Sequence, residues 1–477
     1  MNRPTLATRA GRALVMNVLN TLASRLGTFL IGVALARILG PEEFGTFAVA
    51  LLVLLAVLSF NELGVSLAIV RWPGSPKEIA PTVATVSTLS SLALAIVAVA
   101  GAPAFCAAMG APEATDIVRL LAGSIVLSGI VATPAALLQR EFRAGRRMVI
   151  DQTVNWVGAI ASIAAALAGM GAMSLAVGRI AGALVGAVLF LHAEPIRFGF
   201  DRAIARRLLA YGLPLAGASI VVFSLKFVDQ FVVGNVLGPV ALGFYVLAFN
   251  LSSWPVSVFS QPVRDVSPAA FARLQGDLPS LRKAFVSSVG LLTAVTLPVC
   301  LVLSGAAVPI VSVVYGAEWA PAAAALGWLG ALAGLRILFE LFYDYFVVLG
   351  NTRVIFTVQL IWLVALVPAV YAGTELAGIA GAAAAQVAVA AGIVLPLYLV
   401  ELHRVGIKWM RLAKGVALPL GCGAGVALVS LAASRLISLD VLALAVAGVA
   451  VLAALGIEAR RMRATARALR SVVASAG

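Results

Sequence analysis

The sequence predicts an all-α integral membrane protein with about 14 transmembrane helices, built as two parallel six-helix lobes followed by a C-terminal helix pair. Three observations predict this fold: the composition, the long apolar runs and an internal repeat. The 477 residues are 62% hydrophobic and 11% charged, with a mean hydropathy of +1.07. In a soluble domain, about a quarter of the residues are charged. A water-soluble fold cannot cover so much apolar surface, so the chain is expected to cross a membrane many times.

The apolar runs are long enough for transmembrane helices, each of which requires about 20 residues. They are continuous, and they lack the alternation of polar and apolar residues that marks the strands of a membrane barrel. Two neighbouring runs, near residues 160 and 183, are the least clearly separated. The predicted spans are centred near residues 26, 57, 95, 127, 160, 183, 222, 254, 296, 335, 363, 389, 423 and 448.

The basic residues indicate which side of the membrane each loop faces. With the N-terminus in the cytoplasm, the loops that face inside hold 27 of the 34 Lys and Arg residues. Loops on the other side, such as GPEEF, GAPEATD and GTELAG, are short and mostly acidic. This alternation follows the positive-inside rule and places both termini in the cytoplasm. The net charge of +14 is therefore a topology signal with anionic lipid headgroups as its partner, and it does not indicate nucleic-acid binding.

A short motif occurs twice. Residues 38–45, ILGPEEFG, recur 198 residues later as residues 236–243, VLGPVALG. Six spans separate the two copies and preserve orientation, so the repeat is parallel, as in transporters that bind substrate between their repeats. In the first copy, Gly40–Pro41 is expected to end one span and Gly45 to start the next. The predicted domains are an N-terminal lobe (1–193), a cytoplasmic linker (194–207), a C-terminal lobe (208–402) and a final helix pair with a basic tail (403–477).

Seven cations lie inside the predicted spans, and four of these lie deep. The other three are near span ends, where a long side chain reaches the membrane interface. A charge at the middle of a bilayer costs about 2.5 kcal/mol or more on insertion scales, so a deep cation needs a wet cavity or a charged partner. The predicted substrate-binding cations are Arg25, Arg179, Lys226 and Arg336.

Polar side chains form stripes on several spans. In the first span they recur on one helical face for three turns, the seventh and eighth spans carry similar stripes, and the fifth offers Asp151, Asn155 and Ser162. Such stripes line a cavity or make hydrogen bonds between helices. The predicted cavity-lining residues are Asn17, Thr21, Ser24, Thr28, Asp229, Gln230, Asn250, Ser257 and Gln261.

The acidic residues near these cations allow two interpretations. Lys226 is followed three residues later by Asp229, and a similar acid follows Arg336 after four residues. Each pair is therefore either an ion pair or part of a substrate site. The candidates for ion coupling, with salt bridges as the alternative, are Glu62, Asp229, Glu340 and Asp344. The chain has no Walker A, HExxH or CxxC pattern and no clustered His, so we expect no ATPase, no metal site and no cofactor beyond an H⁺ or Na⁺ gradient.

Four segments carry a resemblance to a known family. They are VALARILGPEEFGTFAVA, NELGVSLAIVR, QREFRAGRRMVIDQ and SQPVRDVSPAAFARLQGD. These segments resemble the oligosaccharide flippases of bacterial polysaccharide biosynthesis, within the multidrug/oligosaccharidyl-lipid/polysaccharide exporter superfamily, and most closely its colanic-acid and exopolysaccharide branch. The resemblance extends from about residue 13 to residue 430.

The resemblance implies two six-helix lobes around a central cavity, alternating access without hydrolytic chemistry, and a location in the bacterial inner membrane. The implied substrate is an oligosaccharide repeat unit on undecaprenyl pyrophosphate, moved from the cytoplasmic to the periplasmic leaflet. The family's basic cavity residues map onto Arg25 and Lys226, with Arg179 and Arg336 behind them. The implied partners are this substrate, membrane lipids and other polysaccharide assembly proteins, and the chain is expected to be a monomer.

Two alternatives remain open. A cation-coupled multidrug exporter of the same superfamily would carry acids rather than bases deep in its cavity, so Arg25 and Lys226 count against it. A membrane polysaccharide polymerase or ligase would need a larger periplasmic region than these loops of about ten residues provide. The sequence does not identify the sugar or the coupling ion.

Overall fold

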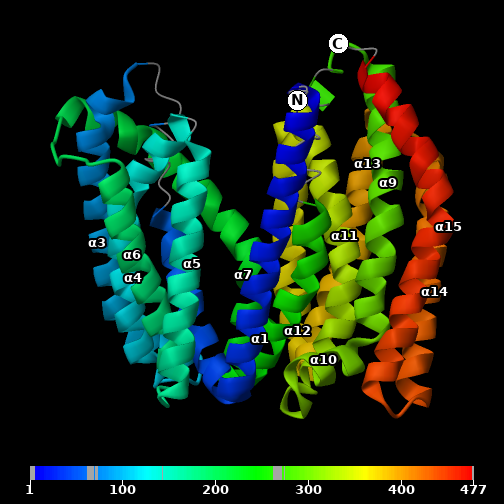
Figure 1. Cartoon of the computed structure of the whole chain (residues 1–477), viewed down its shortest axis with the longest axis horizontal. Helices are drawn as coiled ribbons and strands as arrows, with labels where there is room; N and C mark the ends of the chain where they lie inside the picture. The colour runs from blue at the N-terminus through cyan, green and yellow to red at the C-terminus, as the bar shows by residue number, and fades with distance from the viewer. Residues whose placement is uncertain are drawn as a thin grey trace, which may run out of the picture. The chain divides into compact units, whose positions relative to one another are not determined.

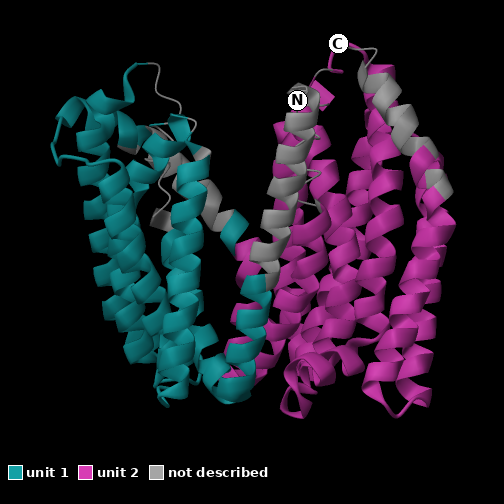
Figure 2. Ribbon diagram, viewed as in Figure 1, with its two compact units in different colours: residues 1–223 teal, residues 224–477 magenta. Residues whose placement is uncertain are grey.

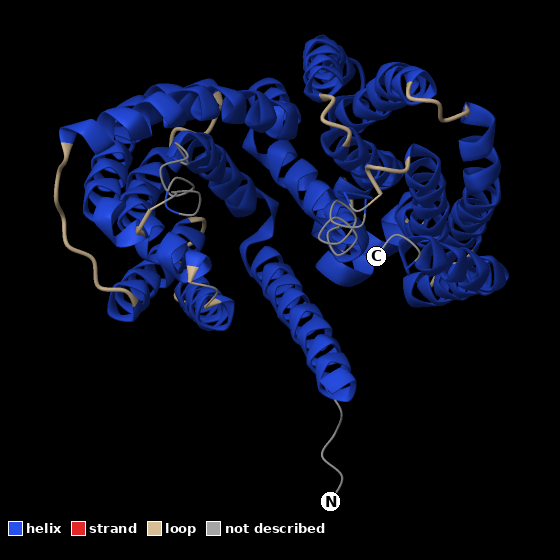
Figure 3. Ribbon diagram, turned by 90° about the horizontal axis from the view of Figure 1, so that it is seen from above, coloured by secondary structure: helices blue, strands red, loops and turns tan. Residues whose placement is uncertain are grey.

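The computed structural model describes residues 6–61, 69, 74–141, 143–260, 271–272 and 274–474. Within these ranges, side chains are described from Gly27 onward, apart from those of residues 60–61, 144, 209, 211–221, 260, 460–461 and 464–474. Every regular element in this part of the chain is a helix, and it contains no strand (Figure 3). The predicted all-α class is confirmed.

The chain divides into two compact units, residues 1–223 (unit 1) and residues 224–477 (unit 2), which Figure 2 shows in different colours. The division falls inside helix α7 (Arg202–Pro255), which contains the seventh predicted span, and thus lies beyond the predicted linker at 194–207. The finer domain limits stay a prediction.

The described part of unit 1 contains five helices and the beginning of α7. The two runs that the sequence separates poorly are distinct helices, α5 and α6, and the turn between them contains Gly169 (φ 81°) and Gly171 (φ 51°). A positive φ is readily adopted by glycine and ends a helix without strain. The helices are α1 (Leu6–Asn61), α3 (Pro76–Ala108), α4 (Ala114–Arg140), α5 (Ala144–Leu167) and α6 (Met173–Ala193) (Figure 1).

Unit 2 contains the rest of α7 and all later elements. Its core includes an aromatic cluster in which the rings of Phe285 and Tyr345 lie 4.2 Å apart and those of Phe342 and Tyr398 lie 5.5 Å apart. The elements after α7 are η1 (Val256–Ser260), α9 (Leu278–Gly305), α10 (Ala307–Tyr315), η2 (Ala317–Trp319), α11 (Ala322–Val348), α12 (Thr352–Val389), η3 (Ala390–Val394), α13 (Leu395–Arg404), α14 (Trp409–Leu436) and α15 (Asp440–Ala474).

Among the described residues, 11 helices are long and apolar enough to cross a membrane. The longest candidate covers Thr352–Arg404, 53 residues, which exceeds the roughly 20 residues that one crossing requires. It has non-helical backbone at Ala377 and Gly378, where the eleventh and twelfth predicted spans meet. The protein is a multi-pass membrane protein, and the count of 14 spans stays a prediction.

Both copies of the Leu-Gly-Pro motif lie at kinks within long helices. Gly40 in α1 has φ 72° and ψ 175°, and Gly238 in α7 has φ 82° and ψ −178°. This backbone region is essentially restricted to glycine. Each following segment begins at the proline, whose fixed φ suits the first position of a helix. The expectation that Gly45 starts the second span is wrong, because Gly45 is buried inside a helix that begins at Pro41.

Polar contacts identify the two ends of unit 1. At one end, Arg143, after α4, forms an ion pair with Glu194, after α6. At the other end, the Glu43 carboxylate accepts a hydrogen bond of 2.6 Å from the Ala172 N–H, at the start of α6. The basic loops at 140–147 and 194–207 therefore share one end, and the GPEEF turn lies at the opposite end with the α5–α6 turn.

Candidate functional site

A pocket of about 520 Å³ lies inside unit 1, between α1, α4, α5 and α6. Its volume is within the range of small-molecule sites, about 300–1,000 Å³. Apolar residues of α1 form one wall, among them Phe47, Leu51 and Leu58. The other walls carry polar side chains, which are Ser124 and Ser128 of α4, Asp151, Asn155 and Ser162 of α5, and Arg179 of α6.

Glycines bring two of these walls together. Gly178, Gly182 and Gly186 are spaced four residues apart on α6 and face α5. A Cβ on Gly182 would lie 2.8 Å from the Val154 carbonyl oxygen, and one on Gly158 of α5 would lie 3.0 Å from the Gly178 carbonyl oxygen. Small residues at this spacing let helix backbones approach closely in membranes. This contact is not among the features predicted from the sequence, although the G-x-x-x-G spacing of α6 is a signal for it.

Among the residues that the structure describes, Arg179 is the only cation that lines the pocket, and no carboxylate of theirs lies within ion-pair distance of it. It follows Gly178, so the glycine contact fixes its level along α5 at Gly158 and Ser162. Arg179 is exposed, so its guanidinium can be solvated or can bind an anion. The deep position predicted for Arg179 thus coincides with a polar pocket.

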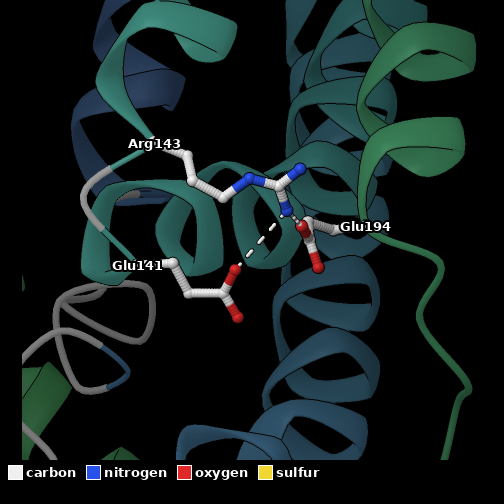
Figure 4. Close-up of polar contacts among 3 residues, drawn as sticks. All are labelled: Glu141, Arg143 and Glu194. Carbon is white, nitrogen blue, oxygen red and sulfur yellow. Dashed lines mark hydrogen bonds and ion pairs between the residues drawn. The ribbon is translucent and has the colours of Figure 1, made fainter.

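Asp151 lies at the opposite end of the pocket, where α5 begins. Its carboxylate is 3.7 Å from Arg147, one turn earlier, and Arg147 donates a hydrogen bond of 2.8 Å to Gln139 at the end of α4. Nearby, Arg143 pairs with both Glu194 and Glu141, and Figure 4 shows its guanidinium between the two carboxylates. A hydrogen bond and an ion pair therefore link α4, α5 and α6 at this end, and Arg147 compensates the charge of Asp151.

Unit 2 holds a different polar cluster. Asp229 of α7 is 2% exposed, and its Oδ2 accepts hydrogen bonds from the Tyr245 hydroxyl at 2.8 Å and from Gln386 Nε2 at 2.9 Å. Its other oxygen, Oδ1, is buried with no hydrogen-bond partner among the described residues. The Arg336 guanidinium lies over the Phe249 ring, 5.0 Å from its centre.

The structure therefore associates Asp229 with Tyr245 and Gln386, and no ion pair joins it to Lys226 among the described side chains. Lys226 is exposed and lies 5.3 Å from the centre of the Phe227 ring. Tyr245 and Gln386 were missed in the sequence, although Gln386 is the single amide in a long run of Ala, Val and Gly. Like Arg179, it falls in the sixth span of its half.

The remaining predicted residues are dispersed. Gln230 and Asp344 are buried, Ser257 and Glu340 are partly buried, and Thr28 and Asn250 are exposed. The Ser257 hydroxyl donates to the Trp254 carbonyl oxygen at 2.9 Å. Glu62, Gln261 and the side chains of Asn17, Thr21, Ser24 and Arg25 lie outside the described residues. Arg25 and Lys226 belong to different units, so their joint action on a substrate stays a prediction.

The long apolar helices, the repeated kink and the polar pocket inside a helical unit define a multi-pass membrane transporter. The sequence profile of one family, polysaccharide biosynthesis protein, matches residues 34–324, which is more than half of the chain. The chain belongs to this family, within the multidrug/oligosaccharidyl-lipid/polysaccharide exporter superfamily.

Two relatives support this assignment over most of the chain. The succinoglycan biosynthesis transport protein ExoT of Rhizobium meliloti is 27% identical over 370 residues, covering 76% of this chain and 74% of the relative. The lipopolysaccharide biosynthesis protein WzxC of Escherichia coli is 22% identical over 355 residues, covering 73% and 71%. These relatives make the chain a transporter of polysaccharide biosynthesis and confirm the resemblance inferred from the sequence.

Two solved structures share the fold. The lipid II flippase MurJ in its inward closed conformation superposes with a TM-score of 0.77 at 14% identity, covering 94% of this chain and 99% of MurJ. An inward-facing multidrug resistance transporter of the MATE family superposes with a TM-score of 0.64 at 17% identity, covering 81% and 96%. At such identities the likeness concerns the fold, which the flippase and the drug transporter have in common.

Proposed function

We propose that the chain is a flippase that moves an oligosaccharide repeat unit, linked to undecaprenyl pyrophosphate, from the cytoplasmic to the periplasmic leaflet of the bacterial inner membrane. The observation that carries the proposal is the unit 1 pocket, whose lining includes the exposed Arg179 together with hydroxyl and amide side chains of α4 and α5. A saccharide offers hydroxyl groups that donate and accept hydrogen bonds, and this lining matches them.

Transport proceeds by alternating access and involves no covalent step. The pyrophosphate must cross about 30 Å of hydrocarbon, and cations on the path stabilise it. Arg25 and Lys226 are the proposed cations for the pyrophosphate, with Arg336 behind them, and the prenyl chain remains in lipid. The chain acts as a monomer with both termini in the cytoplasm, alongside other polysaccharide assembly proteins.

Deleting the gene tests this proposal. Lipid-linked oligosaccharide should accumulate in the cytoplasmic leaflet, because its exit is blocked. The wild-type gene should restore the normal pool, and Arg25→Ala should not. The matched control is Arg119→Ala, because Arg119 is exposed and paired with Asp116 at 2.8 Å. An unchanged pool in the deletion strain, measured by extraction and leaflet-specific labelling, would exclude the proposal.

The Asp229 cluster supports coupling of this transport to an H⁺ or Na⁺ gradient. A carboxylate out of water needs a proton, a paired cation or full hydrogen bonding, and Asp229 Oδ1 has no partner in the described part of the chain. Asp229→Asn should abolish the dependence of transport on the gradient in proteoliposomes, whereas Asp116→Asn should leave it intact. Equal gradient dependence of both variants would contradict a coupling role for Asp229.

The same buried acid favours one second candidate, a cation-coupled multidrug exporter. Such a protein would protect cells from organic cations, and its loss would leave lipid-linked pools unchanged. Arg179 opposes this candidate, because an unpaired cation in the unit 1 pocket repels cationic drugs. Measuring drug susceptibility in the deletion strain separates the two functions.

A further inference from the structure

Residues 195–201, which we call the strap, form the loop between α6 and α7 and are bound to the first turns of α3 (Figure 1). The Thr85 hydroxyl donates a hydrogen bond of 2.8 Å to the Gly199 carbonyl oxygen and accepts one of 3.2 Å from the Gly199 N–H. A Cβ on Gly199 would lie 3.0 Å from Pro81 Cβ. The middle of the strap therefore lies directly against α3, held by both of its backbone polar groups.

The two aromatic residues of the strap are turned away from the protein. Phe198 is 60% exposed and Phe200 is 65% exposed, although the backbone of Gly199 between them is fixed on α3. Neighbouring large apolar side chains that remain exposed outside a membrane span indicate an interaction site. The strap thus presents two rings at a defined position and does not pack them into the core of unit 1.

Cations accompany the two rings. Arg197 lies within the strap and Arg202 follows it as the first residue of α7; both are exposed, and neither has an ion pair among the described residues. The single acid of the strap, Asp201, accepts hydrogen bonds from the N–H groups of Ala203 and Ile204 at 2.7 and 3.2 Å and caps the start of α7. Exposed aromatic and basic side chains together are typical of segments that lie in a membrane interface.

The strap lies at the level where such an interface is expected. Helix α3 ends at Ala108, 23 residues after Thr85, which is about 35 Å at 1.5 Å per residue. The hydrocarbon core of a bilayer is about 30 Å thick. If α3 crosses this core and ends at Ala108, Thr85 and the adjoining Gly199 lie just beyond the hydrocarbon at the basic end of unit 1. Side chains at this level meet lipid headgroups and the upper parts of the acyl chains.

We propose that the strap is an interfacial anchor that binds anionic lipids of the leaflet at the basic end of unit 1. Phe198 and Phe200 enter the boundary between headgroups and acyl chains, where apolar side chains of interfacial segments are buried. Arg197 and Arg202 bind the lipid phosphates, because cations near an anionic leaflet are attracted to it. This inference goes beyond the proposed function, since it gives a role to the loop itself and holds for any transported substrate.

Fluorescence quenching on the full chain in proteoliposomes tests the anchor. A fluorophore on a single cysteine, introduced by Phe198→Cys or Phe200→Cys, is combined with lipids that carry a nitroxide high on the acyl chain. The control is Glu78→Cys, because Glu78 is exposed about two turns farther out on α3. Quenching at positions 198 and 200 should be at least about twofold stronger than at position 78. The native cysteines are replaced in all samples by Cys106→Ala, Cys300→Ala and Cys422→Ala.

The headgroup preference is measured with the same nitroxide on phosphatidylglycerol or on phosphatidylcholine, in vesicles that contain equal amounts of both lipids. At Phe198→Cys, the anionic lipid should quench at least about twofold more strongly than the zwitterionic lipid. Combining Arg197→Gln with Arg202→Gln should reduce this ratio to about one, because the local attraction is lost. Arg119→Gln removes an exposed cation from the opposite end of unit 1 and should leave the ratio unchanged.

Thr85→Val tests whether the contact with α3 positions the rings. This variant keeps the shape of the side chain but removes its hydrogen bonds with Gly199, so quenching at Phe198→Cys should fall toward the value at Glu78→Cys. The control is Thr115→Val, because the Thr115 hydroxyl bonds only to its own turn, at the Pro112 carbonyl oxygen. Unchanged quenching in the Thr85 variant would contradict the positioning role of this contact.

Three further results would overturn the inference. Equal quenching at positions 198, 200 and 78 would place the strap in water, as for a docking surface of a soluble protein. Equal quenching by the two lipids at Phe198→Cys would exclude anionic lipid as the ligand. A preference for phosphatidylglycerol that survives the loss of both arginines would exclude Arg197 and Arg202 as its source. Thermal unfolding of each variant verifies that the comparison is made between folded proteins.

Discussion

Helix α1 of unit 1 and helix α7, most of which belongs to unit 2, turn at a glycine with nearly the same backbone angles but differ in the side chains around the turn. In unit 1, Glu43 reaches the N–H of Ala172 at the start of α6. In unit 2, the residue equivalent to Glu43 is Ala241, which has no carboxylate to accept such a hydrogen bond.

The interiors of the two units differ in the same way. At the repeat offset of 198 residues, Asp229 corresponds to Ile31 and Tyr245 to Phe47. Unit 2 fills this region with a hydrogen-bonded cluster, whereas in unit 1 Phe47 borders an open pocket. The two units thus have the same kinked backbone at this point but different side chains around it. Unit 1 thus has an open pocket beside Phe47, and unit 2 has a hydrogen-bonded cluster around the equivalent Tyr245.

The largest expected effect comes from the two turn glycines. Gly40→Ala and Gly238→Ala should each lower the free energy of unfolding by about 1–3 kcal/mol, because L-residues strongly disfavour this backbone region. Near Gly238 a Cβ would meet no other atom within 4 Å, so backbone strain alone sets the cost there. Thermal unfolding in detergent measures both changes.

Asparagine serves as the control at both turns. It tolerates the left-handed helical region but not the angles found here, so Gly40→Asn and Gly238→Asn should be as unstable as the alanine variants. Rescue by asparagine at one turn only would show that the two turns are not structurally equivalent.

Tyr245 and Phe47 occupy equivalent positions and differ by one hydroxyl group, so exchanging them tests how tightly the interior of each unit is packed. Tyr245→Phe should destabilise the protein by about 1–3 kcal/mol, because the buried Asp229 carboxylate loses a donor. Phe47→Tyr places the same hydroxyl beside a polar pocket and should change stability by less than about 0.5 kcal/mol. If both substitutions lowered the free energy of unfolding by similar amounts, unit 1 would be as tightly packed as unit 2.

The smallest effect is expected at the Glu43 contact. Glu43→Gln should cost about 1 kcal/mol, because the charge-assisted hydrogen bond to the Ala172 N–H is weakened. The neighbouring Glu42→Gln is the control, since Glu42 is exposed and should have no effect. Hydrogen exchange at the Ala172 amide should be faster only in the Glu43 variant. Equally faster exchange in both variants would show that Glu43 does not specifically protect this amide.

Much of the fold could be predicted because membrane insertion leaves strong marks in a sequence. Apolar length, loop charge and the repeated Leu-Gly-Pro motif are local features, and each is visible without knowing how the helices pack. The placement of α5 and α6 depends on the contact between Gly158 and Gly178, which a composition-based interpretation does not identify. The sequence also indicated the polar face of α5 and the isolated Arg179, which the structure shows lining one pocket.

The partners of individual charges were harder to predict. Lys226 and Asp229 are close in sequence, but helix rotation leaves one exposed and buries the other. The actual partners of Asp229 come from residues 16 and 157 positions away. Such pairings depend on tertiary packing between helices, and spacing along one helix cannot specify them. For the same reason, the sequence cannot specify whether Arg25 and Lys226, which belong to different units, act on the same group.

The glycine row on α6 has a consequence for how this protein can acquire new substrates. Because the backbones of α5 and α6 touch there, a larger side chain at Gly178, Gly182 or Gly186 would separate the helices and not merely reshape the pocket. Changes that preserve the fold are instead open to the α1 and α4 walls, at positions such as Phe47 and Leu127. Changes in the shape of the pocket among descendants of this chain should therefore accumulate on those two helices, while the glycine row stays constant.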